Sequence, residues 1–347
     1  MQPAVTILLL NWNGKSYLEQ FLPALLNSSY GNFTVLLADN GSTDGSVEYV
    51  KEFFPEVNLL VLGRNLGYTT GNNKALEQIS SPYFVVLNSD VEVESGWLEP
   101  LVKMMESDPK IASVQPKLRS FHDRTKFEYA GGAGGFIDSW GYPFCQGRLF
   151  GETETDSGQY DKPREIFWAT GACSLIRKSV SDQIGFFEDR FFAHWEEIDF
   201  CWRARNYGYR IVVEPRSVVY HVGGGTLSRQ DPKKTFLNVR NSLATLVMNL
   251  PASELPIRIF VRLLLDGIWG MKAFWNNEFR VLFAIWKAHW VFYFGFFFWL
   301  KRRSQKYRKL EKFVPNSSGK YRGSIVWAHF KNKILTFTGL DRKRIAS

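Results

Sequence analysis

The alternation of apolar and polar residues along the first third of the chain predicts alternating strands and helices. Short apolar runs, which are typical of buried strands, occur at 5–10, 33–38, 57–62, 83–87 and 111–115. We expect helices between them, near 15–27, 45–54, 70–79 and 96–107. Because short connections join strand to helix repeatedly, we predict an α/β fold with a mostly parallel, Rossmann-like sheet and helices on both faces.

The pattern changes after residue 118. Residues 119–165 are rich in Gly, Asp and aromatic residues, which favours loops and short hairpins around a cleft. Regular structure is predicted again at 172–178, as a helix near 196–206, and as short strands at 210–213 and 217–221. We therefore expect a domain over residues 1–230, with halves at about 1–118 and 119–230, and a helical C-terminal region over 231–347.

Charge is distributed unevenly between these two parts. Residues 1–230 contain 21 Lys and Arg against 28 Asp and Glu, whereas residues 231–347 contain 22 against 6. The net charge of +9 is therefore the sum of an acidic body and a strongly basic, aromatic tail. Nucleic-acid binding is disfavoured because the body is acidic and the basic residues adjoin bulky hydrophobic ones.

The hydrophobic part of the tail predicts amphipathic helices at a membrane surface. Arg258, Arg262 and Asp266 recur every four residues as a narrow polar stripe on an otherwise apolar helix. The longest uninterrupted apolar stretch, 290–300, has eleven residues, whereas a spanning helix requires about 20. We expect residues 256–309 to lie on an anionic membrane surface. The alternative is a helical subdomain packed on the body or in a dimer interface.

The cysteines and the first residues favour a cytoplasmic protein. Cys145, Cys173 and Cys201 have no metal-ligand spacing, and we expect all three to be reduced. The first predicted strand starts at residue 5 with no signal peptide before it.

Polar clusters follow the predicted strands at their carboxyl ends, where ligands bind in open α/β sheets. The strand at 83–87 is followed by Asn88 and Asp90, and a carboxylate there can hold a divalent cation against a phosphorylated substrate. The alternative is that Asp90 only caps a turn. The strand at 33–38 ends at Asp39, whose carboxylate can accept hydrogen bonds from a nucleotide base or ribose. Further candidate nucleotide contacts are Asn11, Trp12, Arg64 and Asn65.

Two further motifs carry candidate chemistry. Glu196, Glu197 and Asp199 lie in the first turn of a predicted helix and cannot all face one way. One of them can serve as a general base, while Asp199 is spaced to pair with Arg203. His221 ends a predicted strand before the glycine run 223–225 and is a candidate metal ligand.

In this order the motifs resemble the family 2 glycosyltransferases, and especially the rhamnosyltransferase-like branch, from about residue 4 to about residue 245. The resemblance rests on residues 10–14, 39–46, 65–67, 71–73, 88–90, 170–172, 196–199 and 221. It implies an inverting enzyme with the nucleotide-sugar-binding A-type (GT-A) fold, whose nucleotide-sugar half is residues 1–118 and whose acceptor half is residues 119–230.

The resemblance also implies a role for each motif. Asp39 would contact the base of a nucleotide diphosphate sugar, with Trp12 and Arg64 nearby. Asp90 would be the remaining carboxylate of a DxD-type motif that binds Mg²⁺ or Mn²⁺, and His221 would be a further ligand. Glu197 would be the base that deprotonates the acceptor. Thr170 and Gly171 would help to form the acceptor side of the cleft.

Two residues depart from the family pattern. Asn88 replaces the first Asp of the DxD motif, and Glu197 replaces the usual Asp, so that Glu196 is an alternative base. These departures keep a degenerate, non-catalytic membrane assembly partner as an alternative function. A sugar nucleotidyltransferase is the less favoured alternative, because that chemistry needs a glycine-rich loop with Arg or Lys after the first strand, where residues 11–14 are Asn-Trp-Asn-Gly. The implied donor is dTDP- or UDP-linked, with rhamnose as one possibility. The implied acceptor is a glycan or polyprenyl-linked saccharide, used at the cytoplasmic face of the inner membrane in cell-surface polysaccharide synthesis.

Overall fold

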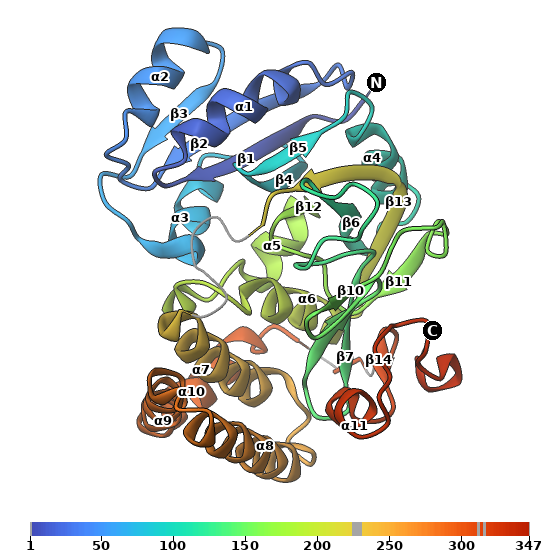
Figure 1. The fold of residues 1–347 in the computed structure, drawn as a ribbon. Helices are drawn as coiled ribbons and strands as arrows, with labels where there is room; N and C mark the ends of the chain where they lie inside the picture. The colour runs from blue at the N-terminus through green and yellow to red at the C-terminus, as the bar shows by residue number, and fades with distance from the viewer. Residues whose placement is uncertain (1, 224–230, 311–312, 315–316, 347) are drawn as a thin grey trace.

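The computed structural model describes residues 2–223, 231–310, 313–314 and 317–346 (Figure 1). The first part of the chain forms four parallel strands in the order β3-β2-β1-β4, which are β1 (Val5–Asn11), β2 (Phe33–Asp39), β3 (Asn58–Val61) and β4 (Tyr83–Asn88). The helices of this part are α1 (Lys15–Leu26), α2 (Ser46–Phe53), α3 (Gly67–Leu76) and α4 (Leu98–Glu106). The predicted α/β fold is confirmed.

Beyond β4 the sheet is mixed rather than parallel. The further strands are β5 (Val91–Val93), β6 (Ile111–Ser120), β11 (Arg164–Ile166), β12 (Cys173–Arg177) and β13 (Arg210–His221). β12 lies antiparallel between β4 and β6, while β13 is parallel to β6 and antiparallel to β5 and β11. The two short strands predicted over 210–221 form one strand, with a shift in register between Glu214 and Val218.

The sheet is buried on both faces, because helices cover both. On β1, Ile7 and Leu9 pack in one core cluster with Leu22 of α1 and Leu101 of α4. Leu8, between them, packs in the other cluster. This explains why β1 is a continuous apolar run without the alternation of a half-exposed strand.

Residues 119–165 supply a second, smaller sheet, as the predicted hairpins suggested. Its strands are β7 (Gly135–Asp138), β8 (Pro143–Cys145), β9 (Arg148–Leu149) and β10 (Glu152–Thr153), paired antiparallel in chain order. β14 (Lys320–Tyr321) pairs parallel with β7, so the end of the C-terminal region returns to this sheet. At Gly135 a Cβ atom would lie 2.2 Å from the ring of Trp168, which leaves room only for glycine.

Helices dominate the remainder of the chain. They are α5 (Lys178–Ile184), η1 (Asp189–Phe191), α6 (Glu196–Asn206), α7 (Pro232–Asn249), α8 (Leu255–Trp275), α9 (Phe279–Phe294), α10 (Phe296–Lys306), α11 (Ile325–Phe330) and η2 (Arg342–Arg344). Figure 1 shows α7–α10 gathered at the end of the molecule away from β1–β3. Among the described residues no single helix is long and apolar enough to cross a membrane, whereas α9 and α10 meet that criterion only together, across a 62° bend.

Candidate active site

The pairing of β5 with β13 brings Asp90 and His221 together. His221 on β13 lies opposite Val91 of β5, next to Asp90, and its Nε2 atom is 3.2 Å from Asp90 Oδ1. Its Nδ1 atom is 3.4 Å from Oε1 of Glu128, which precedes the second sheet. All three side chains are buried. The predicted glycine run after His221 lies outside the described residues from 224 onward.

Glu128 was not found by sequence reasoning, because residues 119–165 showed no periodic pattern. Its carboxylate faces the ring nitrogen of His221 that is turned away from Asp90. A carboxylate in this position fixes the ring orientation of a metal-binding histidine. Glu128 and Asp90 flank opposite sides of the imidazole, and therefore do not converge on one ion.

The donor set at Asp90 and His221 fits a divalent cation. One carboxylate oxygen and one imidazole nitrogen approach each other within 3.2 Å, and both are accepted ligands of Mn²⁺. In the described part of the chain no three His, Cys, Asp or Glu side chains form a group that could hold a metal ion by themselves. An ion held by Asp90 and His221 would take its other ligands from substrate phosphates and water, as Mg²⁺ commonly does.

The electrostatics of the pair have a clear direction. Burial lowers the pKa of His221, but the carboxylates of Asp90 and Glu128 outweigh it and raise that pKa to about 10. Burial raises the pKa of Asp90, and the hydrogen bond and charge of His221 bring it below its ordinary value. Without a cation the two side chains form an ion pair, and a cation would replace the imidazole proton.

Glu196 and Glu197 open α6 as a buried acidic pair. Burial raises the pKa of Glu197 to about 7, and burial together with the charge of Glu197 raises the pKa of Glu196 well above its ordinary value. The Oε2 atom of each is buried without a hydrogen-bond partner. Glu197 is the more exposed of the two and ionises first. A carboxylate with a pKa near 7 is suited to general base catalysis.

Tyr68 of α3 is sensitive to the charges of both groups. Burial, followed by the charges of Glu196, Glu197 and Asp90, raises its pKa well above the ordinary value. Its hydroxyl donates to the carbonyl of Gly171 at 2.7 Å. Tyr68 is a second residue that sequence reasoning missed, although it lies between the recognised segments 65–67 and 71–73.

The backbone before the acidic pair is strained. Phe192, His194 and Trp195 have positive φ values of 66°, 69° and 74°, a region that costs free energy for residues other than glycine. Asn241 of α7 holds this segment, because its Nδ2 atom donates to the carbonyls of Phe191, Ala193 and His194 at 3.1, 3.0 and 2.8 Å. The C-terminal region thus fixes the approach to Glu196 and Glu197.

Asp199 does not belong to the catalytic group, and its prediction as a candidate base is corrected here. Its carboxylate is fully buried between α6, α7 and α10, where it pairs with Arg203 Nε at 2.9 Å and Lys306 Nζ at 3.3 Å. Asn249 donates to it at 2.8 Å. These donors hold the pKa of Asp199 below its usual value against the effect of burial, so it stays ionised as a structural anchor.

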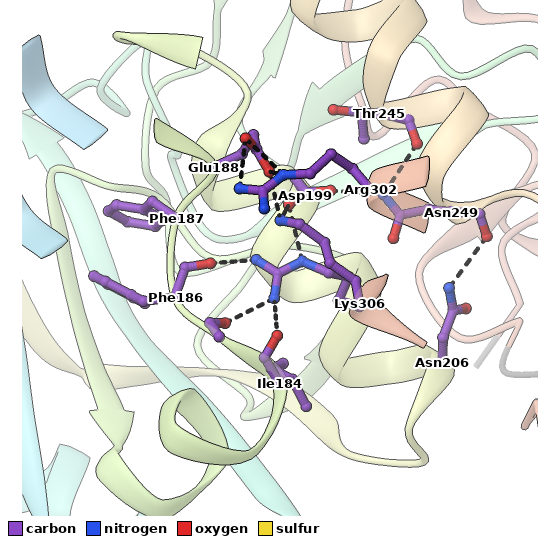
Figure 2. A network of polar contacts seen from close by, with 12 residues as sticks. Ile184, Phe186, Phe187, Glu188, Asp199, Asn206, Thr245, Asn249, Arg302 and Lys306 are labelled. Atoms are coloured by element: carbon purple, nitrogen blue, oxygen red, sulfur yellow. Dashed lines mark hydrogen bonds and ion pairs between the residues drawn. The ribbon is translucent and has the colours of Figure 1, made fainter. Parts of the chain in front are cut away.

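Figure 2 shows the network around Asp199, which joins α6 to α7 and α10. Lys306 lies between Asp199 and the buried carboxylate of Glu188, 3.2 Å away. Arg302, one turn earlier on α10, pairs with the same Glu188 at 3.0 Å. Two carboxylates of the catalytic body are therefore neutralised by cations of α10 (Figure 2).

The carboxylate of Asp39 is buried and accepts hydrogen bonds from the backbone of the turn that follows it. It is 1% exposed, and its Oδ1 atom accepts from the backbone N–H groups of Gly41 and Ser42 at 3.1 and 3.0 Å. Its Oδ2 atom accepts from Nδ2 of Asn11 at 3.1 Å. Asp39 and Asn11 thus meet at neighbouring strand ends, as predicted, and their described contacts stabilise the turn. Contact with a nucleotide stays a prediction.

The other predicted nucleotide contacts lie at the surface beside this turn. Trp12 is 43% exposed, and Arg64 and Asn65 are exposed as well. A Cβ atom at Gly41 would lie 2.5 Å from the Cα atom of Arg64, so glycine is required where the two loops touch. The side chains that the sequence placed in one crevice are therefore neighbours.

The predicted acceptor segment, Thr170 and Gly171, is linked by hydrogen bonds to neighbouring backbone groups. Thr170 Oγ1 donates to the carbonyl of Ala130 at 2.5 Å and accepts from the N–H of Ala172 at 3.1 Å. The carbonyl of Ala172 in turn accepts from the N–H of Asn88 at 2.9 Å. Thr170 is 3% exposed, and its side chain bonds to backbone groups. The carbonyl of Gly171 accepts a hydrogen bond from the hydroxyl of Tyr68.

Comparison with known proteins places these motifs in a family. The model described as Glycosyl transferase family 2 matches residues 6–185. N-acetylglucosaminyl-diphospho-decaprenol L-rhamnosyltransferase of Mycobacterium tuberculosis is 27% identical over 236 residues, which cover 64% of this chain and 76% of the relative. Low-salt glycan biosynthesis hexosyltransferase Agl10 of Haloferax volcanii is 24% identical over 208 residues, which cover 58% of this chain and 61% of the relative.

Solved structures show the same fold. GalNAc-T7 with UDP, GalNAc and Mn²⁺ superposes with a TM-score of 0.55 at 15% identity over 71% of this chain, which spans about half (48%) of the GalNAc-T7 chain. The Pyrobaculum calidifontis mannosyltransferase PcManGT, with GDP-Man and Mn²⁺, gives a TM-score of 0.51 at 15% identity over 83% of this chain and 74% of that one. With the GT-A fold in place and a family model that covers more than half of its length, the chain belongs to glycosyl transferase family 2.

Proposed function

We propose that this protein is a metal-dependent inverting glycosyltransferase that moves a sugar from a dTDP- or UDP-linked donor to a lipid-linked saccharide. The observation that carries the proposal is the contact between Asp90 and His221, whose side chains lie 3.2 Å apart where β5 pairs with β13. The acidic pair Glu196 and Glu197 at the start of α6 supports it as the source of the base. Rhamnose is the donor sugar that the named Mycobacterium relative suggests.

The roles of the residues follow from their chemistry. Asp90 and His221 would hold Mg²⁺ or Mn²⁺, which supplies positive charge against the donor diphosphate. Glu197 accepts the proton of the acceptor hydroxyl. As that oxygen forms its bond to the anomeric carbon, the bond from this carbon to the diphosphate oxygen breaks on the opposite side. The configuration is inverted, and the diphosphate leaves with the electron pair.

Glu196 stays protonated, because burial and the charge of Glu197 raise its pKa well above the ordinary value. Tyr68 stays protonated, and its hydroxyl points to the carbonyl of Gly171. The pair therefore carries a single negative charge near the acceptor, which suits one proton transfer per turnover.

The acceptor and location are also part of the proposal. The name of the Mycobacterium relative contains a diphospho-decaprenol carrier, and a carrier of this kind keeps its saccharide at a bilayer. We place the reaction at the cytoplasmic face of the inner membrane, in cell-surface polysaccharide synthesis, with residues 256–309 toward the lipid.

The first experiment is calorimetric titration of the purified protein with a panel of nucleotide diphosphates and their sugars, with and without Mn²⁺. We expect one base to bind in a Mn²⁺-dependent way, and Asp90→Asn to abolish that dependence. Glu92→Gln is the matched control, because Glu92 is the neighbouring carboxylate but pairs with Arg124 at 2.9 Å.

The outcomes separate the proposed function from its alternatives. A folded protein that binds no nucleotide at any Mn²⁺ concentration would contradict the transferase reaction and favour a non-catalytic partner. Mn²⁺-dependent nucleotide binding that is equal in the wild type, Asp90→Asn and Glu92→Gln would show that Asp90 does not hold the cation.

A further inference from the structure

Helix α8 turns its polar side inward and its apolar side outward. Large apolar side chains recur every three or four residues along one face and are 51–73% exposed: Ile257, Phe260, Leu264, Ile268, Met271 and Trp275. The polar stripe found in the sequence lies on the opposite face, where Arg262 and Asp266 are 4% and 1% exposed. In a helix that packs on a water-soluble body, the two faces have the reverse disposition.

The inward polar face is fixed by specific contacts. Arg262 donates to Ser242 Oγ of α7 at 2.9 Å and to the carbonyl of Gly141 at 3.2 Å. Asp266 lies 3.3 Å from Nε2 of His289 on α9. Rotating α8 to bury its apolar residues would break these contacts and leave a buried charge unpaired. The outward apolar face is therefore a built feature of the fold.

Helices α9 and α10 continue this face. Phe283, Trp286, Trp290 and Phe294 form a row of neighbouring rings, with successive centroid distances of 5.4, 6.1 and 5.7 Å. Phe294 and Phe297 are 83% and 81% exposed. The inner side of α9 instead carries small residues such as Ala284 and Ala288, which allow close packing. We call the exposed large apolar side chains of α8, α9 and α10 the apolar face.

The exposed charges between residues 255 and 310 are mostly positive. Between residues 255 and 310, all of them described, a single acidic side chain, Glu278, is exposed. Six exposed side chains there are cationic: Lys272, Arg280, Lys287, Lys301, Arg308 and Lys309. Arg308 and Lys309 also line a groove of about 270 Å³ beside Arg302 and Lys306.

We propose that the apolar face docks into the interface of an anionic lipid bilayer. Aromatic side chains surrounded by Lys and Arg are suited to the boundary between anionic headgroups and acyl chains. A second copy of the chain fits less well, because its cations would lie against those of the first. The docking that we propose is peripheral, with α8, α9 and α10 lying in the plane of the interface. The proposal rests on this surface alone and does not require the proposed reaction.

The test is cosedimentation of the full-length protein with vesicles. We expect it to bind vesicles that contain phosphatidylglycerol more tightly than vesicles of phosphatidylcholine alone, and the binding to weaken as salt is added. Tryptophan fluorescence should be quenched by bromine atoms placed high on the acyl chains, because Trp286 and Trp290 lie on the apolar face.

The diagnostic variant is Phe283→Asp, and the matched control is Phe53→Asp on α2, since the two side chains are 59% and 58% exposed. We expect Phe283→Asp to weaken vesicle binding by about tenfold or more, because a ring that the bilayer would bury is replaced by a charge. Phe53→Asp should leave vesicle binding unchanged. Equal binding by both variants would overturn the proposal.

A different occupant would give a different result. A protein that ignores both kinds of vesicle, but sediments as a dimer that Phe283→Asp dissociates, would show that the apolar face is a protein interface. Nucleotide binding, measured by calorimetry on the same samples, tests the proposed reaction separately, so the failure of one proposal is not mistaken for failure of the other.

Discussion

The central sheet and helices α8–α10 are both rich in large apolar side chains, but they place them in opposite ways. Phe84 on β4 is completely buried, whereas Phe283 on α9 is 59% exposed. The buried polar residues of α8 are involved in ion pairs and hydrogen bonds, while its apolar residues face outward. The sheet thus buries its apolar side chains, whereas α8 buries its polar side chains and exposes apolar ones.

The comparison shows what hydrophobic periodicity reports. A period of 3.6 residues shows that a helix has two faces, but it does not say which face turns toward the protein. The partners decide this, and on α8 they are Ser242, the carbonyl of Gly141 and His289. None of these partners was visible as such in the sequence.

The candidate base at the start of α6 gives the largest expected effect. Glu197→Gln removes the proton acceptor without changing its size, and we expect kcat to fall by ~10²–10⁴-fold. Glu196→Gln mimics the protonated carboxyl and should lower kcat far less. Rates are measured with donor and acceptor at saturation, and calorimetry checks that the donor still binds. A larger fall in kcat for Glu196→Gln than for Glu197→Gln would identify Glu196 as the base.

Paired truncations test the contrast directly. Phe84→Ala opens a cavity in the sheet core, so we expect the free energy of unfolding to fall by ~3–5 kcal/mol. Phe283→Ala removes an exposed ring and should change it by less than about 0.5 kcal/mol in the absence of lipid. Denaturant unfolding of both variants measures the difference. A large loss in Phe283→Ala would mean that the apolar face is covered in solution.

The ion pairs of Lys306 on α10 with Glu188 and Asp199 give the next prediction. Lys306→Met removes the cation between Glu188 and Asp199, both fully buried, and we expect the protein to lose about 3 kcal/mol of stability. Lys309→Met is the control, since Lys309 is exposed and should have little effect. Denaturant midpoints of the two variants give the comparison. Equal midpoints would show that Arg302 and Arg203 neutralise the carboxylates without Lys306.

Sequence reasoning succeeded where a short local pattern determines the structure. The strands before Asp39 and Asp90 and the helix from Glu196 lie close to where the sequence put them. The sequence did not place Glu128, because its role depends on a contact with His221, which is distant along the chain. The sequence also grouped Asp199 with Glu196 and Glu197 as candidate bases. The contacts of Asp199 with Arg203, Lys306 and Asn249, which distinguish it from the other two, depend on the packing of α6 against α7 and α10.

Asn241 tests whether the C-terminal region positions the base. Asn241→Ala removes three hydrogen bonds to the strained segment before Glu196, so we expect a loss of about 2 kcal/mol in stability. If the segment then relaxes, kcat should fall while KM for the donor stays the same. Asn238→Ala, about one turn earlier on α7, is the control for a general effect on the helix, because the Asn238 side chain donates to the carbonyl of Lys234 in the same helix. An unchanged kcat in a destabilised Asn241→Ala would assign Asn241 a purely structural role.

The smallest expected effect is the pH dependence of the rate. Burial raises the pKa of Glu197 to about 7, so the protonated form, which cannot act as a base, prevails below that pH. We therefore expect kcat/KM to fall by about tenfold per pH unit below 7 and to level off above it. Glu196, Tyr68 and Asp90 face the same region, but the first two stay protonated and Asp90 stays ionised near pH 7. The residual activity of Glu197→Gln should lack this dependence, because the titrating carboxyl is gone. A profile that keeps its step near pH 7 in Glu197→Gln would assign the step to another group and remove Glu197 from the role of base.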